Sequence, residues 1–178
     1  YAATSAKKPF EVKKAVLDSM SYGNAGRGAR SASLKASRTI FQARREICEF
    51  FDADRPEQVV FTSGITESLN LVIKGILEPG DHVITTYMEH NSVLRPLYEM
   101  EQKGVSLTIT DPYPEAIARE FRKNTKAVIM THGSNVTGEV FDIAAIGALC
   151  REKGIRLIAD TAQTAGIFPI SMKKDQID

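Results

Sequence analysis

The chain has 178 residues, a length that fits one domain able to bury a sizeable core. Its 23 Lys and Arg residues balance 22 Asp and Glu residues, so the formal net charge of +1 predicts no nucleic-acid partner and no membrane surface. No apolar run approaches the ~18 residues of a membrane span, and the N-terminus carries no export signal. The cysteines, Cys48 and Cys150, suggest a reducing cytoplasm, and we expect both to be packing residues rather than nucleophiles.

The first third of the chain is predicted to be helical. Apolar residues at helical spacing indicate a helix over residues 10–21, and the glycine-rich stretch 23–28 then breaks it. A long amphipathic helix follows over residues 31–51.

From residue 59 onward, short apolar runs alternate with helical patterns. The predicted strands cover 59–61, 83–86, 105–109, 127–130 and 156–159, and the predicted helices cover 66–77, 92–103, 114–122 and 142–153. Gly104 and Gly154 are placed to end two of these helices. Apolar strands separated by helices are typical of parallel strands covered on both faces. The predicted fold class is therefore α/β, with a doubly wound, mostly parallel sheet flanked by helices.

Polar and glycine-rich loops follow four of the predicted strands. They cover residues 62–67, 88–92, 131–138 and 160–166. In open α/β sheets, ligands bind beyond the carboxyl ends of the strands. Four such loops on one edge predict a site there.

Each loop also has an ordinary structural reading. The hydroxyls of residues 62–66 could simply cap a helix, or the loop could cradle a phosphate. His90 could be a solvated loop histidine, and we expect His82 and His132 to be nothing more than that. Asp160 ends an apolar strand, so its carboxylate needs a cationic or donor partner, supplied either by a ligand or by an Asx turn at Thr161 and Ala162.

Five strings carry a resemblance that covers nearly the whole chain. They read Asn-Ala-Gly-Arg-Gly at 24–28, Phe-Thr-Ser-Gly-Ile-Thr-Glu at 61–67, Glu-His-Asn-Ser at 89–92, Ser-Asn-Val-Thr-Gly at 134–138, and Asp-Thr-Ala-Gln-Thr-Ala-Gly at 160–166. In this order they resemble the class V aminotransferase family of fold-type-I pyridoxal 5'-phosphate (PLP) enzymes, in particular its cysteine-desulfurase and selenocysteine-lyase members.

The resemblance implies a role for each matching residue. Thr66 and the amides of Gly64 and Ile65 would hold the PLP phosphate, and His90 would stack on the pyridine ring. Asp160 would bond the pyridine nitrogen and keep it protonated. The remaining contacts implied are Gln163 to the phenolic oxygen of the ring and Asn135 beside that oxygen and the substrate. His90 and Asp160 are the implied catalytic residues, and no metal is implied.

The resemblance also implies an activity and a domain organisation. The expected reaction converts L-cysteine to L-alanine and leaves a persulfide on the enzyme, with an amino-acid substrate, a possible sulfur-acceptor protein and a homodimer. Residues 1–30 would form an N-terminal helix and active-site loop segment, and 31–178 a PLP-binding large domain incomplete at its C-terminus. The Schiff-base lysine and the nucleophilic cysteine are expected outside this chain, so the chain alone is expected to be inactive.

Two alternatives stay open at this point, and a third is disfavoured. The parent protein could be another class V enzyme, such as an aminotransferase, an epimerase or a kynureninase-like enzyme. The chain could also bind cofactor or a partner chain without catalysis. A Rossmann-type nucleotide module is disfavoured, because the glycines at 23–28 have the wrong spacing and follow a helical pattern rather than a strand.

Overall fold

The computed structural model describes residues 6–26 and 30–178. It divides into two compact units, the first made of Tyr1–Glu49 and Asp54–Val59 and the second of Phe50–Ala53 and Val60–Asp178. The string at 24–28 lies partly outside the described residues, because Arg27 and Gly28 are not among them. The remaining four strings lie in the second unit.

The first unit contains α1 (Phe10–Ser19), most of α2 (Ser31–Phe50) and a short 3-10 helix, η1 (Pro56–Gln58). Both long helices were predicted from apolar spacing. Between them the chain doubles back at Gly23, whose N–H donates to the carbonyl of Ala32 at 3.2 Å. A Cβ at position 23 would lie 2.8 Å from Ser33 Oγ and 3.0 Å from Ser33 N, so this approach to α2 favours glycine.

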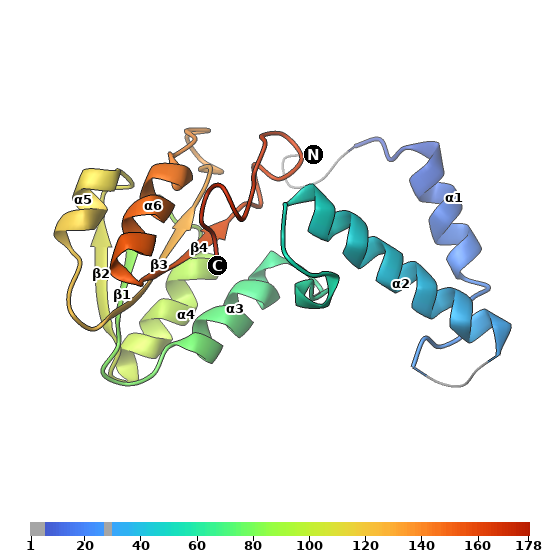
Figure 1. Ribbon diagram of the computed structural model, residues 1–178, viewed down its shortest axis with the longest axis horizontal. Helices are drawn as coiled ribbons and strands as arrows, with labels where there is room; N and C mark the ends of the chain where they lie inside the picture. The colour runs from blue at the N-terminus through green and yellow to red at the C-terminus, as the bar shows by residue number, and fades with distance from the viewer. Residues whose placement is uncertain (1–5, 27–29) are drawn as a thin grey trace. The chain divides into compact units, whose positions relative to one another are not determined.

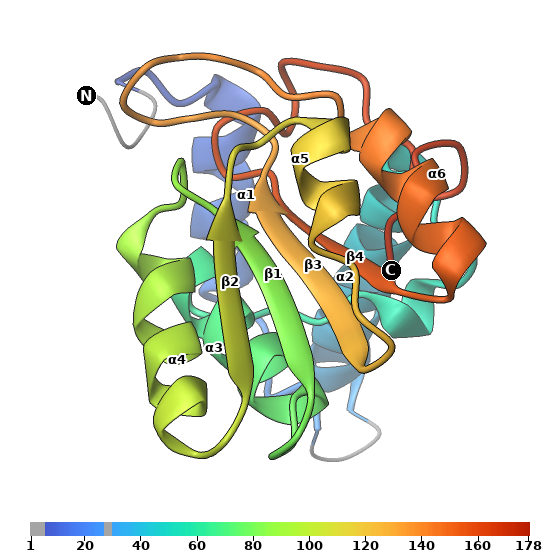
Figure 2. The same cartoon turned by 90° about the vertical axis from the view of Figure 1, so that its left-hand side faces the viewer.

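The second unit is built on a parallel four-stranded sheet in the order β2-β1-β3-β4 (Figure 2). The strands are β1 (His82–Thr86), β2 (Ser106–Thr110), β3 (Thr125–Thr131) and β4 (Arg156–Asp160). The apolar runs of the sequence predicted all four. β1 and β3 run through the middle of the sheet, and five residues of β1 in succession are buried, as a central parallel strand requires.

Helices cover both faces of this sheet (Figure 1). On one face, α3 (Ile65–Ile76) and α4 (Asn91–Gln102) pack with Val83, Ala127 and Ile129. On the other, α5 (Pro114–Arg119) and α6 (Ile143–Lys153) pack with Ile84, Val128 and Met130. Neighbouring residues of a strand point to opposite faces, so this alternation produces two separate cores. The doubly wound α/β fold predicted from the sequence is therefore observed.

Some local predictions were wrong. Residues 59–61 form no strand: the N–H groups of Gln58 and Val59 donate to Arg55 and Pro56 carbonyls in a local turn, and Val60 is 70% exposed. The helix predicted over 114–122 is shorter, since α5 ends at Arg119. Gly154, at φ 67°, does end α6 as expected.

Two histidines expected in solvent are buried. His82 is fully buried at the start of β1, where its Nδ1 lies 2.8 Å from Thr125 Oγ1 and its Nε2 lies 2.9 Å from Thr108 Oγ1. Hydroxyls on the two flanking strands thus satisfy the ring, which explains why a polar residue is tolerated inside the sheet. Burial lowers the pKa of His82 to about 4, so the ring is neutral. His132 is 7% exposed, and burial lowers its pKa as well.

Within the described residues, no helix is both long enough and apolar enough to cross a membrane.

Candidate functional site

The carboxyl ends of β1 and β3 mark the point where the sheet changes its direction of winding. The chain leaves β1 through α4 on one face and leaves β3 through α6 on the opposite face. A crevice at such a switch point is where open α/β sheets bind their ligands. Figure 2 shows the loops that follow β3 and β4 at this end of the sheet.

The loop 62–67 brings the start of α3 to this region, although no strand precedes it. Gly64 is the N-cap residue and offers no side chain, and the N–H groups of Gly64, Ile65 and Thr66 have no acceptor among the described residues. Glu67 turns back instead, and its Oε2 accepts from Ser63 N–H at 2.7 Å and Ser63 Oγ at 2.6 Å. These two bonds lower the pKa of Glu67 and fix the loop. The result is an exposed helix start with free amides and the Thr66 hydroxyl, a suitable environment for an anion.

His90 is the N-cap residue of α4 and is held by its own helix. Its Nδ1 accepts from Ser92 N–H at 3.1 Å and lies 2.8 Å from Ser92 Oγ. Nδ1 is therefore the unprotonated nitrogen of the neutral ring, and Nε2 carries the proton. The ring is exposed but anchored, so it is not simply a mobile solvated side chain.

Thr66 and His90 line one pocket of about 320 Å³, whose other lining residues come from α3 and α4. One of these is Arg95, an exposed cation without an ion-pair partner among the described residues. Glu99, by contrast, is neutralised by Lys74 and Lys103. Arg95 was not singled out from the sequence. The sequence signal that could have identified Arg95 is its spacing. It lies four residues after Asn91 in the helix capped by His90, and residues four apart lie on the same helix face.

Asp160, at the end of β4, is 4% exposed. Its Oδ1 accepts from Ala162 N–H at 3.0 Å, which is the Asx turn that the sequence allowed. No described residue donates to its Oδ2. This oxygen of a largely buried carboxylate is left available, so this side of Asp160 suits a ligand that brings a cation or an N–H group.

The loop after β3 is folded tightly on itself. Gly138 N–H donates to Ser134 O at 3.0 Å, and Ser134 Oγ accepts from the N–H groups of Val136 and Thr137. Asn135 lies exposed in this turn. The loop also lies against the one after β4, because a Cβ at Gly133 would be 2.7 Å from Thr164 Cγ2 and 3.9 Å from Gln163 Cβ.

The sequence-predicted residues thus fall into two groups. Gly64, Ile65, Thr66 and His90 belong to the starts of α3 and α4, and two of them share a pocket. Asp160 ends β4, Gln163 and Asn135 belong to the loops after β4 and β3, and none of the three lines that pocket. Both groups lie in the second unit.

Two buried atoms near Asp160 have no hydrogen-bond partner, namely His132 Nδ1 and Thr164 Oγ1. A third is Glu89 Oε2, just beyond the end of β1, and the sequence alone assigned Glu89 no role of its own. These atoms show that the polar groups at this edge are incompletely satisfied by the described residues.

Neither cysteine has the character of a nucleophile. Both are buried, and burial together with the charge of Asp178 raises the pKa of the Cys150 thiol to about 12. This agrees with the packing role expected from the sequence.

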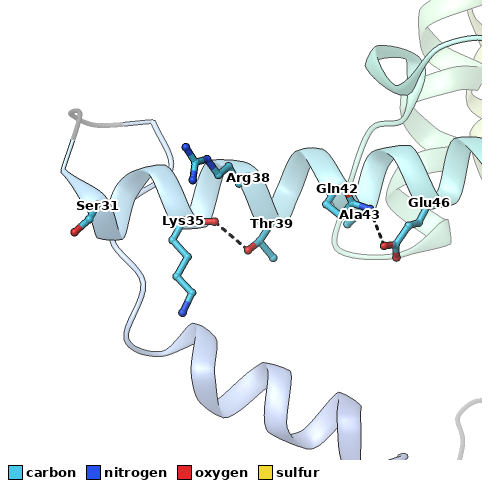
Figure 3. Close-up of a pocket in the computed structure, with 7 residues that line it drawn as sticks. All are labelled: Ser31, Lys35, Arg38, Thr39, Gln42, Ala43 and Glu46. Carbon is cyan, nitrogen blue, oxygen red and sulfur yellow. Dashed lines mark hydrogen bonds between the residues drawn. The ribbon is translucent and has the colours of Figure 1, made fainter.

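A larger depression of about 650 Å³ lies in the first unit, lined by residues of α2 alone: Ser31, Lys35, Arg38, Thr39, Gln42, Ala43 and Glu46 (Figure 3). The bonds drawn there join residues one helical turn apart, Thr39 Oγ1 to Lys35 O and Gln42 Nε2 to Glu46 Oε1. Such bonds are typical of a solvated helix surface. The larger depression therefore shows only the features of an ordinary helix surface, and the sheet edge stays the candidate site.

Comparison with known proteins gives a family match over the whole chain. The family model described as Aminotransferase class-V matches residues 1–178. The cysteine desulfurase IscS of Pseudomonas fluorescens (strain SBW25) is 36% identical over 191 residues, an alignment covering 100% of this chain and 47% of that protein. The chain therefore spans about half the length of the curated relatives it matches.

Solved structures give the same result. The cysteine desulfurase CsdA from Escherichia coli superposes with a TM-score of 0.83 at 26% identity, covering 99% of this chain and 48% of that one. The structure described as SspA in complex with cysteine gives a TM-score of 0.87 at 31% identity, covering 100% and 54%.

Proposed function

The chain belongs to the class-V aminotransferase family, and from that premise we propose that it is the cofactor-binding part of a PLP-dependent cysteine desulfurase. The observation that carries the proposal is Asp160, a buried carboxylate at the switch-point edge whose Oδ2 receives no donor from the described residues. A protonated pyridine nitrogen is a donor of the required kind.

The residues at this edge fit PLP in charge and in position. The free amides of Gly64 and Ile65, with the Thr66 hydroxyl, would hold the phosphate, as helix starts do. His90 would lie on the pyridine ring, since Nδ1 is already engaged by Ser92 and the ring is otherwise exposed. Gln163 would donate to the phenolic oxygen of the ring, and Asn135 would lie beside that oxygen and the substrate. Bound PLP supplies the electron sink for bond breaking next to the substrate nitrogen.

Each protein group has a limited task. Asp160 keeps a proton on the pyridine nitrogen, because a nearby carboxylate favours the cation. Its Asx turn to Ala162 fixes the direction of the carboxylate before any ligand arrives. The Ser92 bonds fix His90 in the same way, so both groups are preorganised by local backbone structure.

The proposed reaction takes L-cysteine to L-alanine. The substrate C–S bond breaks, the sulfur forms an S–S bond with an enzyme thiolate, and a proton replaces the sulfur on carbon. The thiolate and the lysine that bonds the cofactor would lie outside residues 1–178, since Cys48 and Cys150 are buried and Lys173 pairs with Asp52. The selenium analogue of cysteine is a second substrate of the same chemistry.

We further propose the organisation that the family suggests. Residues 1–30 would contribute a helix and an active-site loop, and residues 31–178 would form the PLP-binding large domain. The complete protein would act as a cytoplasmic homodimer in sulfur metabolism and would pass its sulfur to an acceptor protein. Other class V reactions, namely transamination, epimerisation and kynurenine cleavage, remain the alternatives, because they use the same PLP contacts.

The test is turnover by the complete protein. Purified apoprotein would be given L-cysteine with and without added PLP, and alanine and protein-bound persulfide would be measured separately. We expect both products in equal amounts and only with PLP. Alanine without persulfide, or transamination products instead of alanine, would replace the desulfurase assignment by another class V reaction.

A further inference from the structure

Glu89 lies at the switch point and joins the two strands that separate there. Its Oε1 accepts from Thr86 Oγ1, at the end of β1, at 2.6 Å and from Thr131 N–H, at the end of β3, at 2.9 Å. The last paired residues of these two strands are Ile84 and Val128. The carboxyl group of Glu89 therefore extends the connection between β1 and β3 beyond their last paired residues. The residue is 9% exposed.

The second oxygen of Glu89 is in a different position. Oε2 is buried and has no hydrogen-bond partner among the described residues. An ionised carboxylate would leave a charged oxygen unsolvated there, whereas a neutral acid would leave only an O–H group. Burial accordingly raises the pKa of Glu89 to about 7, and the charge of Asp160 acts in the same direction.

Among the described residues on neighbouring elements, Asp160 is the charged group that raises the pKa of Glu89. β1 and β3 present neutral donors, the hydroxyl of Thr86 and the amide of Thr131. On α4, the adjacent His90 directs Nδ1 to Ser92. His132, directly after β3, is buried with a lowered pKa and is therefore neutral. Burial and, to a smaller extent, the charge of Asp160 thus favour the protonated form of Glu89, and the groups named here offer no cation to oppose this.

Resting on the proposed function, we propose that Glu89 is a positioning residue of the cofactor site. It keeps a proton on Oε2 so that Asp160 is the single anion at the edge. In this state the strand ends are tied together by a neutral group, and the negative charge is concentrated on the residue that meets the pyridine nitrogen. Ionisation of Glu89 adds a second buried charge at the edge, between the loops at 88–92 and 131–138 that its side chain connects.

The first test needs no cofactor. The complete apoprotein, labelled with ¹³C at the glutamate side-chain carboxyl, would be titrated by NMR, and the signal of Glu89 identified by its absence in both Glu89→Gln and Glu89→Asp. We expect a signal that titrates near neutral pH, well above the other glutamates. In Asp160→Asn the midpoint should fall, because a neighbouring negative charge has been removed. An ordinary acidic midpoint, or a midpoint unmoved by Asp160→Asn, would overturn the proposal.

The second test links Glu89 to the cofactor. PLP affinity of the complete protein would be followed by absorbance between about pH 6 and about pH 8.5 in the native protein and in Glu89→Gln, which retains the Oε1 acceptor and cannot ionise. As the pH rises over this range, we expect the PLP affinity of the native protein to fall about tenfold more than that of the glutamine variant. Equal pH profiles would contradict a positioning role. Failure of both proteins to bind PLP would instead remove the proposed function, while the NMR titration would still decide the pairing of Glu89 with Asp160.

Discussion

The carboxylate of Asp160 accepts a hydrogen bond at 3.0 Å from the backbone N–H of Ala162, two residues further along the chain. This bond uses Oδ1 and fixes the turn after β4, and it leaves Oδ2 for a ligand. A carboxylate is needed for the second task but not for the first, because an amide oxygen can accept the same bond. The structural and chemical tasks of Asp160 can therefore be separated.

Asp160→Asn should retain the turn and lose the charge. We expect the complete protein to keep its thermal stability, since Asn Oδ1 replaces the acceptor for Ala162, and to lose at least about a hundredfold in cysteine turnover. Asp160→Ala should lose both, with reduced stability from the unmade bond to Ala162. Turnover close to native in Asp160→Asn would show that a negative charge at this position is not required.

His90 also combines two tasks, as the N-cap of α4 and as the proposed ring partner of the cofactor. His90→Asn provides a cap without a ring, whereas His90→Ala provides neither. We expect both variants to change the absorption spectrum of bound PLP, and His90→Ala alone to lose about 1 kcal/mol of stability. Spectra identical to the native one in both variants would restrict His90 to its capping role.

His82 should make the fold sensitive to acid. Its pKa is about 4 in the folded protein, against an ordinary value of 6.5 for the unfolded chain. The unfolded chain therefore binds more protons between these values, and stability falls as the pH drops through this range. The loss amounts to about 3 kcal/mol once the pH is below about 4. His82→Gln retains polar groups for Thr108 and Thr125 but cannot titrate. Urea unfolding at a series of pH values should give a flatter profile for this variant, and an unchanged slope would contradict a neutral buried His82.

A side chain at position 133 should fit only if the loop after β4 moves. Its Cβ would lie 2.7 Å from Thr164 Cγ2, closer than packed carbons allow. We expect Gly133→Ala to cost about 1–3 kcal/mol of stability and to weaken PLP binding, because the loops after β3 and β4 would be pushed apart. Thr164→Ser removes the obstructing methyl group, so adding it should restore part of the loss. Additive effects of the two substitutions would contradict the contact.

Periodicity alone was sufficient for the fold because the information is local. The apolar runs that became β1 to β4 and the helical patterns between them are properties of short segments, and parallel pairing follows from their alternation. Residues 59–61 show the limit of such reasoning. The run is apolar, but whether it joins a sheet depends on a neighbouring strand, and here Val59 N–H donates to Pro56 O in a local turn instead.

The site could be predicted only where its residues are consecutive. The loops of Thr66, His90 and Asp160 are visible as short strings, and for His90 and Asp160 the location at one edge follows from the ends of β1 and β4. Glu89 was not assigned a role, because its partner Thr131 is 42 positions away and its effect depends on burial. His82 was placed in solvent for the same reason, since Thr108 and Thr125 reach it from adjacent strands.

The most direct test of the account is covalent capture of PLP. The complete protein and the 178-residue chain would each be incubated with PLP, reduced with borohydride and measured as intact masses, with Asp160→Asn of the complete protein as the matched variant. We expect one PLP adduct on the complete protein, at a lysine beyond residue 178, a weaker adduct in the variant, and none on the shorter chain. Absence of a specific adduct on the complete protein would mean that this edge of the sheet does not bind PLP, and the proposed enzyme activity would be wrong.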